Sequence, residues 1–377
     1  MDGQKAIRKP VTVPVRIFLI VAALILILWG GATIYLHENP YYAISPGDAI
    51  SVSRLISVPP SKSHQIKGKI LLTDVLLGQV ASAQLPADLL NKYVDLVPSQ
   101  QVLGQSVTPS QLVQISTLQM SQSQDEAEIA ALAHVGLSVP AASSGVLVLG
   151  LIKGLGKEPG LVPGDVISAV NGTSVNGPVE LQDLIKVKKP GSVVALTVEN
   201  GLEGVPKQIK ATLVSGIVAG KPTTLIGIEV DPNPVQTYHL PFPISINSDQ
   251  IGGPSAGAAF TLGIIDALSN GDITGGKVIA ATGTIDASGN IGPIGGLPQK
   301  MVAVRRAGAS IFFVPFGQSK SDYKSAVQFS EGKVRIVKVE NIGQILNYLA
   351  RMGGDMQGVE INPKSPSGAL GSASSAA

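Results

Sequence analysis

The longest apolar stretch of the chain is an uncharged run from Ile17 to Leu36. Twenty helical residues at a rise of 1.5 Å each extend for about 30 Å, the thickness of the hydrocarbon core of a bilayer. The basic segment before it, residues 1–16, predicts a cytoplasmic N-terminus. The alternative, a signal peptide, has a shorter apolar core and a small-residue cleavage site, which the end of this run lacks. We therefore expect a single transmembrane helix over 17–36 and place the bulk of the chain outside the cytoplasmic membrane.

The region 37–133 is soluble in character and has a less regular pattern. It predicts a strand at 69–75 and a short helix at 86–94. Thr108 followed by a proline predicts the start of a longer helix that continues to Ala133. Two interpretations stay open: this region packs against the later domains, or it supplies the first part of the C-terminal one.

Short strands separated by turns fill the region 134–216. The predicted elements are strands at 144–151, within 160–172 and at 193–199, and a helix at 179–185. This pattern resembles a bacterial PDZ domain. The resemblance implies that peptide C-termini are captured by strand addition, with the terminal carboxylate held by backbone amides. Gly136 and Leu137 are the candidate peptide-binding residues.

A glycine-rich segment precedes an apolar run at 256–268 with helical spacing. Pro254 suits the first position of a helix, so Ser255 should lie in the first turn. The N–H groups of a first turn lack intrahelical partners and lie at the positive end of the helix dipole, so they can stabilise an oxyanion. The candidate amides are those of Gly253, Ser255 and Ala256. A single serine at a helix start is more often only a cap, so the catalytic interpretation requires a base.

The choice of base is narrowed by chain order. Residues 253–257 also match the G-x-S-x-G pattern of α/β-hydrolases, which place their histidine after the serine. All four histidines of this chain precede Ser255, so that fold is excluded. His239 lies in the same region without a recognisable motif and stays an alternative base. A lysine is favoured.

Three separated motifs then follow one another at compatible spacing: GGPSAG at 252–257, ATGTID at 281–286 and PIGGLPQK at 293–300. Together they resemble the Lon protease family, and we assign residues 217–352 to a Lon-type proteolytic domain. The resemblance implies a catalytic dyad of Ser255 and Lys300, with Thr282 supporting the lysine amine. One departure is Gly252, which stands where most Lon proteases carry an acidic residue.

Composition excludes several other classes of function. Lysine and arginine (28) nearly balance aspartate and glutamate (26), which gives no indication of nucleic-acid binding. The chain has no cysteine, so disulfides, cysteine nucleophiles and cysteine-ligated metals are excluded. Its four histidines form no H-E-x-x-H pattern, which argues against a zinc hydrolase. We expect neither a metal nor a cofactor.

Residues 271–278 nearly match a phosphate-binding loop. Val278 replaces the hydroxyl residue that would bind Mg²⁺, and the segment follows a predicted helix and precedes a predicted strand, the reverse of the required order. We therefore expect no ATP binding. The low-complexity tail, residues 353–377, is expected to be disordered.

These patterns predict an α+β protein that is a membrane-anchored, ATP-independent serine endopeptidase. Its expected partners are unfolded or flexible polypeptides, peptide C-termini at the PDZ domain, and the membrane. An oligomer of the chain is compatible with the sequence. The competing hypothesis is a non-catalytic membrane scaffold in which a Lon-like fold supports the PDZ domain.

Overall fold

The computed structural model describes a large part of the chain. The described residues are 19–26, 30, 38–64, 67–104, 107–137, 139, 141–152, 155, 160–200, 206–218, 220–238, 240–248 and 251–363. The predicted cytoplasmic segment 1–16, most of the predicted transmembrane run 17–36 and the tail beyond 363 lie outside these residues. None of the helices within the described part combines the length and the apolar character needed to cross a bilayer.

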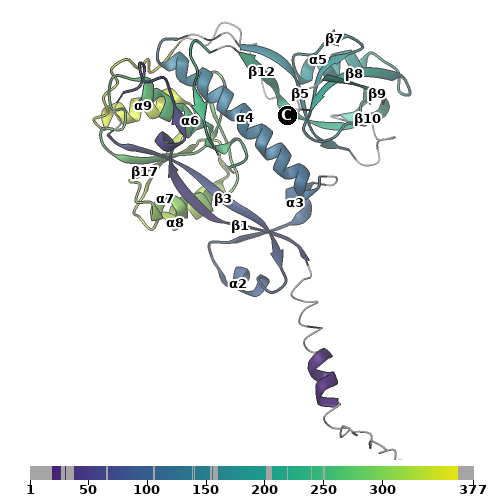
Figure 1. The fold of residues 1–377 in the computed structure, drawn as a ribbon, viewed down its shortest axis with the longest axis horizontal. Helices are drawn as coiled ribbons and strands as arrows, with labels where there is room; N and C mark the ends of the chain where they lie inside the picture. Colours follow the sequence, from purple (N-terminus) through teal and green to yellow (C-terminus); the bar gives the residue numbers. More distant parts are fainter. Residues whose placement is uncertain are drawn as a thin grey trace, which may run out of the picture.

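Mixed α+β structure is observed in two units that each contain a six-stranded sheet. The sheet of the unit with more helices, here called the larger sheet, is built from both ends of the described chain (Figure 1). Its strand order is β18-β17-β14-β3-β1-β4. The strands are β1 (Glu38–Ser51), β3 (Lys69–Ala81), β4 (Asp95–Pro98), β14 (Val278–Ala281), β17 (Ile311–Pro315) and β18 (Arg335–Val339). β14 runs parallel to both β3 and β17. The early region 37–133 therefore supplies part of the sheet that also holds the C-terminal strands, which is the second of the two interpretations left open above.

Helices cover both faces of this sheet, because its central strands have apolar side chains on both sides. The helices are α4 (Pro109–His134), α6 (Gly257–Leu268), α7 (Leu297–Arg306), α8 (Lys320–Ser330) and α9 (Ile342–Arg351). In β3, Leu72 faces a core shared with α4, α6 and α9, whereas Leu71 faces a core shared with α7 and α8. In β17, Phe313 and Phe312 divide in the same way. This alternation is the period of two that a strand imposes on its side chains.

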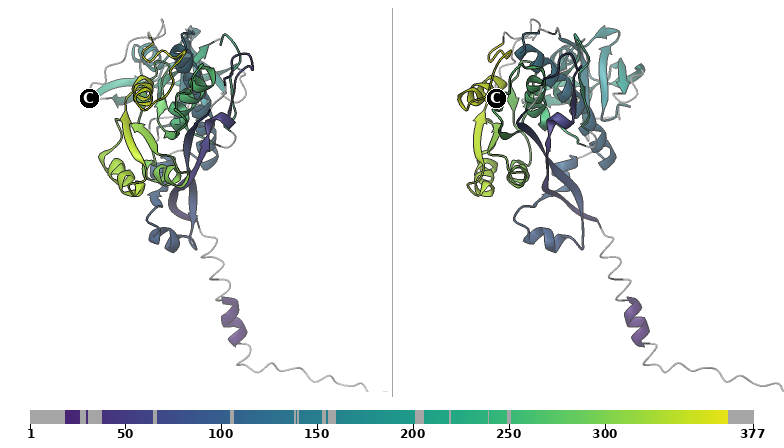
Figure 2. Two further views of the ribbon diagram at one scale, coloured as in Figure 1. Left: turned by 90° about the vertical axis from the view of Figure 1, so that its left-hand side faces the viewer. Right: turned by 60° about the vertical axis from the view of Figure 1, so that its left-hand side comes forward.

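The sheet of the other unit, here called the smaller sheet because its unit has fewer helices, has the strand order β12-β5-β6-β8-β9 and its own core. Its strands are β5 (Ala141–Leu151), β6 (Asp165–Val170), β8 (Val193–Asn200), β9 (Pro206–Thr212) and β12 (Ile228–Tyr238). Helix α5 (Pro178–Lys186) contributes two buried side chains, and the short strand β7 (Thr173–Ser174) pairs with β6. A hairpin of β10 (Val214–Val218) and β11 (Lys221–Leu225) follows β9. Figure 2 shows this sheet to one side of the larger one.

The elements of the structure extend across two of the predicted boundaries. The smaller sheet does not end at 216, because β12 pairs with β5 along its length and adds residues 228–238 to it. The tail predicted to be disordered from 353 is packed up to 363: Met356, Val359 and Ile361 lie against the larger core. Apolar residues spaced two or three apart hold this segment, a signal that the glycine content of the tail obscured in the sequence.

Candidate active site

Ser255 lies in a tight turn that opens the most deeply buried helix of the described structure. The 3₁₀ turn η2 (Pro254–Ala256) leads directly into α6, in which every residue except Leu268 is buried. Gly253 precedes the turn with a φ of 80°, a conformation that favours glycine. Its N–H donates to the carbonyl of Ser116 on α4, at 2.8 Å. The turn is therefore fixed to the rest of the core on both sides of the serine.

Lys300 approaches the serine from α7, on the other face of the sheet. Its Nζ lies 2.8 Å from Oγ of Ser255 and donates to the carbonyl oxygen of Thr73 at 2.7 Å. The lysine side chain is 2% exposed. Burial lowers the pKa of Lys300 to about 8, because a charged amine loses its hydration there, while the negative charge of Asp74 acts in the opposite direction. A substantial fraction of the amine is thus neutral slightly above neutral pH, which a general base requires.

Thr282 takes a different position from the one implied by the resemblance. Its hydroxyl donates to the carbonyl oxygen of Ser255 at 3.1 Å, and the N–H of Gly283 donates to the same oxygen at 3.0 Å. The residue therefore holds the backbone of the serine rather than the amine of Lys300. Thr73 on β3 contacts the amine instead. Sequence reasoning missed Thr73, because a backbone carbonyl carries no side-chain signature; only the predicted strand at 69–75 could have indicated it.

The three candidate oxyanion amides are not equivalent. The N–H of Gly253 already donates to Ser116 and is directed towards α4, so it is removed from the set. Ser255 and Ala256 lie within the opening turn, where N–H groups have no preceding helical carbonyl to bind. They stay the candidates for stabilising a tetrahedral intermediate.

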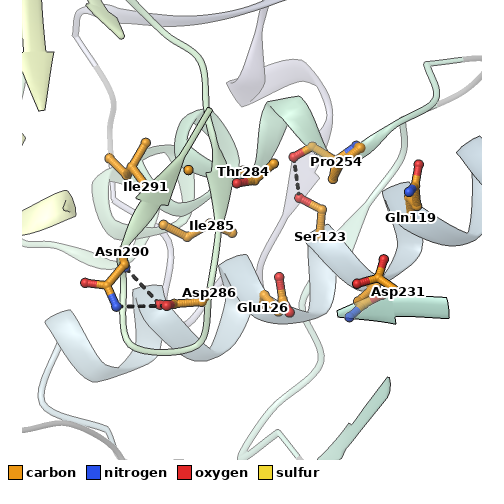
Figure 3. Close-up of a pocket in the computed structure, with 12 residues that line it drawn as sticks. Gln119, Ser123, Glu126, Asp231, Pro254, Thr284, Ile285, Asp286, Asn290 and Ile291 are labelled. Atoms are coloured by element: carbon orange, nitrogen blue, oxygen red, sulfur yellow. Dashed lines mark hydrogen bonds between the residues drawn. The ribbon is translucent and has the colours of Figure 1, made fainter. Parts of the chain in front are cut away.

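A cavity of about 270 Å³ lies beside this turn, on the side of α4 (Figure 3). Its lining residues are Gln119, Gln122, Ser123, Glu126, Asp231, Pro254, Thr284, Ile285, Asp286, Asn290, Ile291 and Gly292. Burial raises the pKa of Glu126 to about 8, and the nearby negative charge of Asp286 adds to this effect. Ser123 donates to the carbonyl of Pro254 at 3.0 Å, so α4 connects the cavity with the turn that carries Ser255. No cluster of potential metal ligands occurs within the described residues.

Gly136 and Leu137, the candidate peptide-binding residues, directly follow the C-terminal end of α4. The N–H of Gly136 donates to Ala133 and the N–H of Leu137 donates to Leu132, which closes the C-terminal end of α4. The strand that follows, β5, is paired with β12 on one edge and with β6 on the other. Strand addition requires an unpaired edge, and on the β6 side only Val146 and Leu147 of β5 are paired, so the peptide site expected at Gly136 and Leu137 stays a prediction. His239, the alternative base, lies outside the described residues.

Comparison with known proteins adds independent information on the C-terminal region. A family profile described as the Lon protease (S16) C-terminal proteolytic domain matches residues 227–351. The Lon protease of Campylobacter jejuni is 27% identical over 191 residues, which cover 48% of this chain and 24% of that protein. The Lon protease of Trichlorobacter lovleyi is 36% identical over 94 residues, which cover 25% of this chain and 11% of that protein.

The Lon protease of Clostridioides difficile gives a similar match, 28% identical over 192 residues, which cover 50% of this chain and 23% of that protein. The matches to all three span about a quarter or less of their length. Among solved structures, the PDZ domain of the SdrC-like protein from Listeria monocytogenes matches at 26% identity and a TM-score of 0.20, covering 23% of this chain and 87% of that one. The sequence match over residues 227–351 is the informative one: this chain contains a proteolytic domain of the Lon type.

Proposed function

We propose that this protein is a serine endopeptidase that hydrolyses peptide bonds with Ser255 as nucleophile and Lys300 as general base. The observation that carries the proposal is the 2.8 Å contact between Oγ of Ser255 and Nζ of Lys300. The amine is buried and its pKa is lowered to about 8, which suits proton transfer close to neutral pH.

The reaction begins when the neutral amine of Lys300 accepts the hydroxyl proton of Ser255 as Oγ attacks the peptide carbonyl. The amides of Ser255 and Ala256 stabilise the resulting oxyanion. Collapse of the intermediate breaks the C–N bond, and the lysine ammonium donates its proton to the leaving amine. Water then attacks the acyl-serine with the lysine again as base, which releases the second product. The carbonyl of Thr73 orients the amine throughout, and Thr282 holds the backbone of the serine.

Nucleotide is not required in this proposal. In the loop that resembles a phosphate site, the carboxylate of Asp272 accepts from the N–H groups of Thr274 and Gly276. The lysine of that loop, Lys277, donates to the carbonyl of Met352. These hydrogen bonds stabilise a turn between α6 and β14, so the amides and the lysine already have partners within the protein. Without an unfolding motor, the substrates are unfolded chains or flexible segments.

Membrane anchoring and recruitment complete the proposal. The uncharged run 17–36 with its basic flank supports a single-pass anchor, with residues from 37 onward outside the cytoplasm. Residues 19–26 are helical, and six of their large apolar side chains are exposed to solvent. The smaller sheet recruits substrates or partners through peptide C-termini. A peptide strand can add at the two end strands, β12 and β9, or along the part of β5 that is not paired with β6.

The test is hydrolysis of a fluorogenic unstructured peptide by the full chain in detergent, with and without ATP. We expect cleavage that ATP does not change and that Ser255→Ala abolishes. Ser174→Ala, which alters an exposed serine of the smaller sheet, is the matched control and should retain the full rate. Equal cleavage by wild type and Ser255→Ala would remove Ser255 as the nucleophile, and cleavage by neither would favour the competing scaffold hypothesis.

A further inference from the structure

The outer end of the β1–β3 hairpin has an unusual concentration of exposed leucines. We define the arm as residues 41–46 of β1, residues 75–81 of β3, the helix α2 (Leu85–Leu90) and the strand β4. The exposed fractions of its leucines are 61% for Leu76, 44% for Leu77, 68% for Leu89 and 88% for Leu90. Figures 1 and 2 show α2 and the outer ends of β1 and β3 projecting away from the helices that cover the sheet.

The leucines of β3 are exposed on both faces of the strand. Leu76 and Leu77 are adjacent, so their side chains point to opposite sides of the hairpin. A helix covering only one face would therefore leave the other leucine in water. Single exposed apolar residues are ordinary, but four leucines within fifteen residues mark an interaction surface.

The base of the arm is held firmly against the body of the protein. The ring of Tyr93, three residues after α2, packs edge to face on Phe329 of α8 with ring centroids 5.1 Å apart. Its hydroxyl donates to Glu331 at 3.3 Å and lies 3.5 Å from a guanidinium nitrogen of Arg305. Since α2 is tied to α8 in this way, the exposure of Leu89 and Leu90 is a property of the fold.

The position of the arm in the chain indicates what covers it. β1 begins at Glu38, two residues after the uncharged run 17–36 ends, so the arm starts where an anchored chain leaves the bilayer. We propose that the arm inserts its leucines into the outer leaflet of the membrane that holds the anchor. This proposal rests on the membrane anchor of the proposed function. Tyr41, exposed at the start of the hairpin, is an aromatic residue of the kind enriched at the membrane–water interface.

A lipid surface fits the arm better than a second copy of the chain. Every anchored copy brings its own arm to the bilayer without any encounter between proteins, because the anchor and the arm are almost contiguous in sequence. Leucines on both faces of a narrow hairpin can also enter an acyl layer together, whereas a flat protein partner would cover one face. Interfacial binding of this kind increases with the apolar area that enters the membrane.

The arm also determines how far the active site lies from the membrane surface. Thr73, whose carbonyl holds Lys300, lies four residues before Leu77 on the same strand. At a rise of about 3.3 Å per residue, the reacting groups lie roughly 13 Å along β3 from the inserted leucines. The substrate class that follows is flexible polypeptide close to the outer membrane surface, such as the segments that link anchored proteins to their membrane spans.

The test uses the absence of cysteine from this chain. A single Leu90→Cys substitution in the full chain is labelled with an environment-sensitive fluorophore, and the protein is reconstituted into phosphatidylcholine vesicles that contain nitroxide lipids. Val187→Cys, at a residue of the smaller domain that is 76% exposed, is the matched control. Leu89→Cys is the second position if the first variant folds poorly, and peptide cleavage at the wild-type rate shows that each labelled chain is folded.

We expect nitroxide lipids to quench the label at 90 strongly and to leave the label at 187 unchanged. Equal quenching of the two labels by the nitroxide lipids would overturn the proposal. A label at 90 that is shielded from soluble iodide but not quenched by the nitroxide lipids would also overturn it, and would indicate a second copy as the partner. Flotation of the vesicles distinguishes failure of the membrane anchor from failure of the inserted arm. A chain that does not float with the vesicles would contradict both proposals. A chain that floats but whose label at 90 is not quenched would contradict the proposal on the arm alone.

Discussion

The two units of this protein each bury an ionisable side chain, and the two side chains differ in whether they form an ion pair. In the smaller unit, the fully buried carboxylate of Asp165 is paired with Lys207 at 3.1 Å and accepts the N–H of Val162. In the larger unit, Lys300 is nearly as buried, yet it forms no ion pair with any described residue and contacts only a carbonyl and a hydroxyl. A paired buried charge stabilises one arrangement of the chain, whereas an unpaired buried amine gives up its proton easily. The comparison separates a structural group, Asp165, from the proposed general base, Lys300.

The largest expected effect comes from removing the reactive group. Lys300→Arg should lower kcat/KM for peptide cleavage by about 10²–10⁴-fold, because arginine stays protonated throughout the accessible pH range and cannot accept the proton of the serine. The measurement is hydrolysis of a fluorogenic peptide under conditions where the substrate is well below its KM.

Lys300→Met is the control for folding. Methionine has a similar length and no charge, so at pH 7 the variant should be equally inactive but should melt no lower than wild type, since the protein no longer buries an unpaired amine. An active Lys300→Met protein would remove the distinction between the two buried groups.

A matched pair of core substitutions tests whether the two units are independent. Ile264 in α6 and Ile167 in β6 are both 0% exposed and belong to separate cores. Each change to alanine should cost about 2–5 kcal/mol of folding free energy. We expect Ile264→Ala to lower the thermal transition at which peptidase activity is lost.

Ile167→Ala should instead lower a second transition, observed by calorimetry, and leave the initial rate of peptide cleavage unchanged at 25 °C. A single shared transition that both variants lower equally would show that the two cores unfold as one.

The sequence alone predicts the proposed pair of reacting side chains, which lie 2.8 Å apart in the structure, but it does not predict what surrounds them. Ser255 and Lys300 lie in glycine-rich motifs whose spacing can be recognised directly. Thr73 contributes a backbone carbonyl from a strand more than two hundred residues away, and any residue would supply that atom. The pairing of β3 with β14 that brings it there depends on long-range packing rather than on local pattern.

In the smaller unit the elements could be predicted from the sequence, but not how all of them pair. Its strands and helix were predictable from the pattern of apolar residues, but the pairing of β12 with β5 was not. β12 contains two prolines, at 232 and 234, and prolines usually exclude a central strand, so the segment did not resemble a sheet element. It is in fact an end strand with register shifts around these residues. The peptide site inferred from Gly136 stays a prediction, because β6 pairs with only Val146 and Leu147 of the strand that follows it.

A smaller effect is expected from the acidic residue nearest to the reactive amine. Asp74 raises the pKa of Lys300, so Asp74→Asn should move the midpoint of the pH–rate profile to lower pH. The rate at pH 7 should rise by no more than about tenfold, which corresponds to one pH unit. Asparagine keeps an oxygen that can accept the N–H of Asp48, which Asp74 now binds. Asp48→Asn, which changes an exposed carboxyl nearby, is the control and should shift the profile less.

The smallest expected effect concerns Glu126, in the cavity beside the serine turn. Its pKa is raised to about 8, from a usual value of 4.5, so the folded protein holds this proton over a range in which the unfolded chain has lost it. Stability from this group is present at low pH and is lost as the pH rises towards 8. The melting temperature of wild type should therefore fall between pH 5 and pH 8. In Glu126→Gln this fall should be smaller by a few degrees. Glu229→Gln, at an exposed carboxyl on β12, should not change that dependence.

The most direct test of the central claim is the pH dependence of covalent labelling at the serine. The full chain is treated with a serine-directed fluorophosphonate at each pH, and the modified peptide is identified and quantified by mass spectrometry. The account predicts one adduct, on Ser255, whose rate of formation rises with a midpoint near the pKa of about 8 and then levels off. An adduct on another residue, or a rate that rises only near the ordinary lysine pKa of about 10.4, would contradict the assignment of Lys300 as the base.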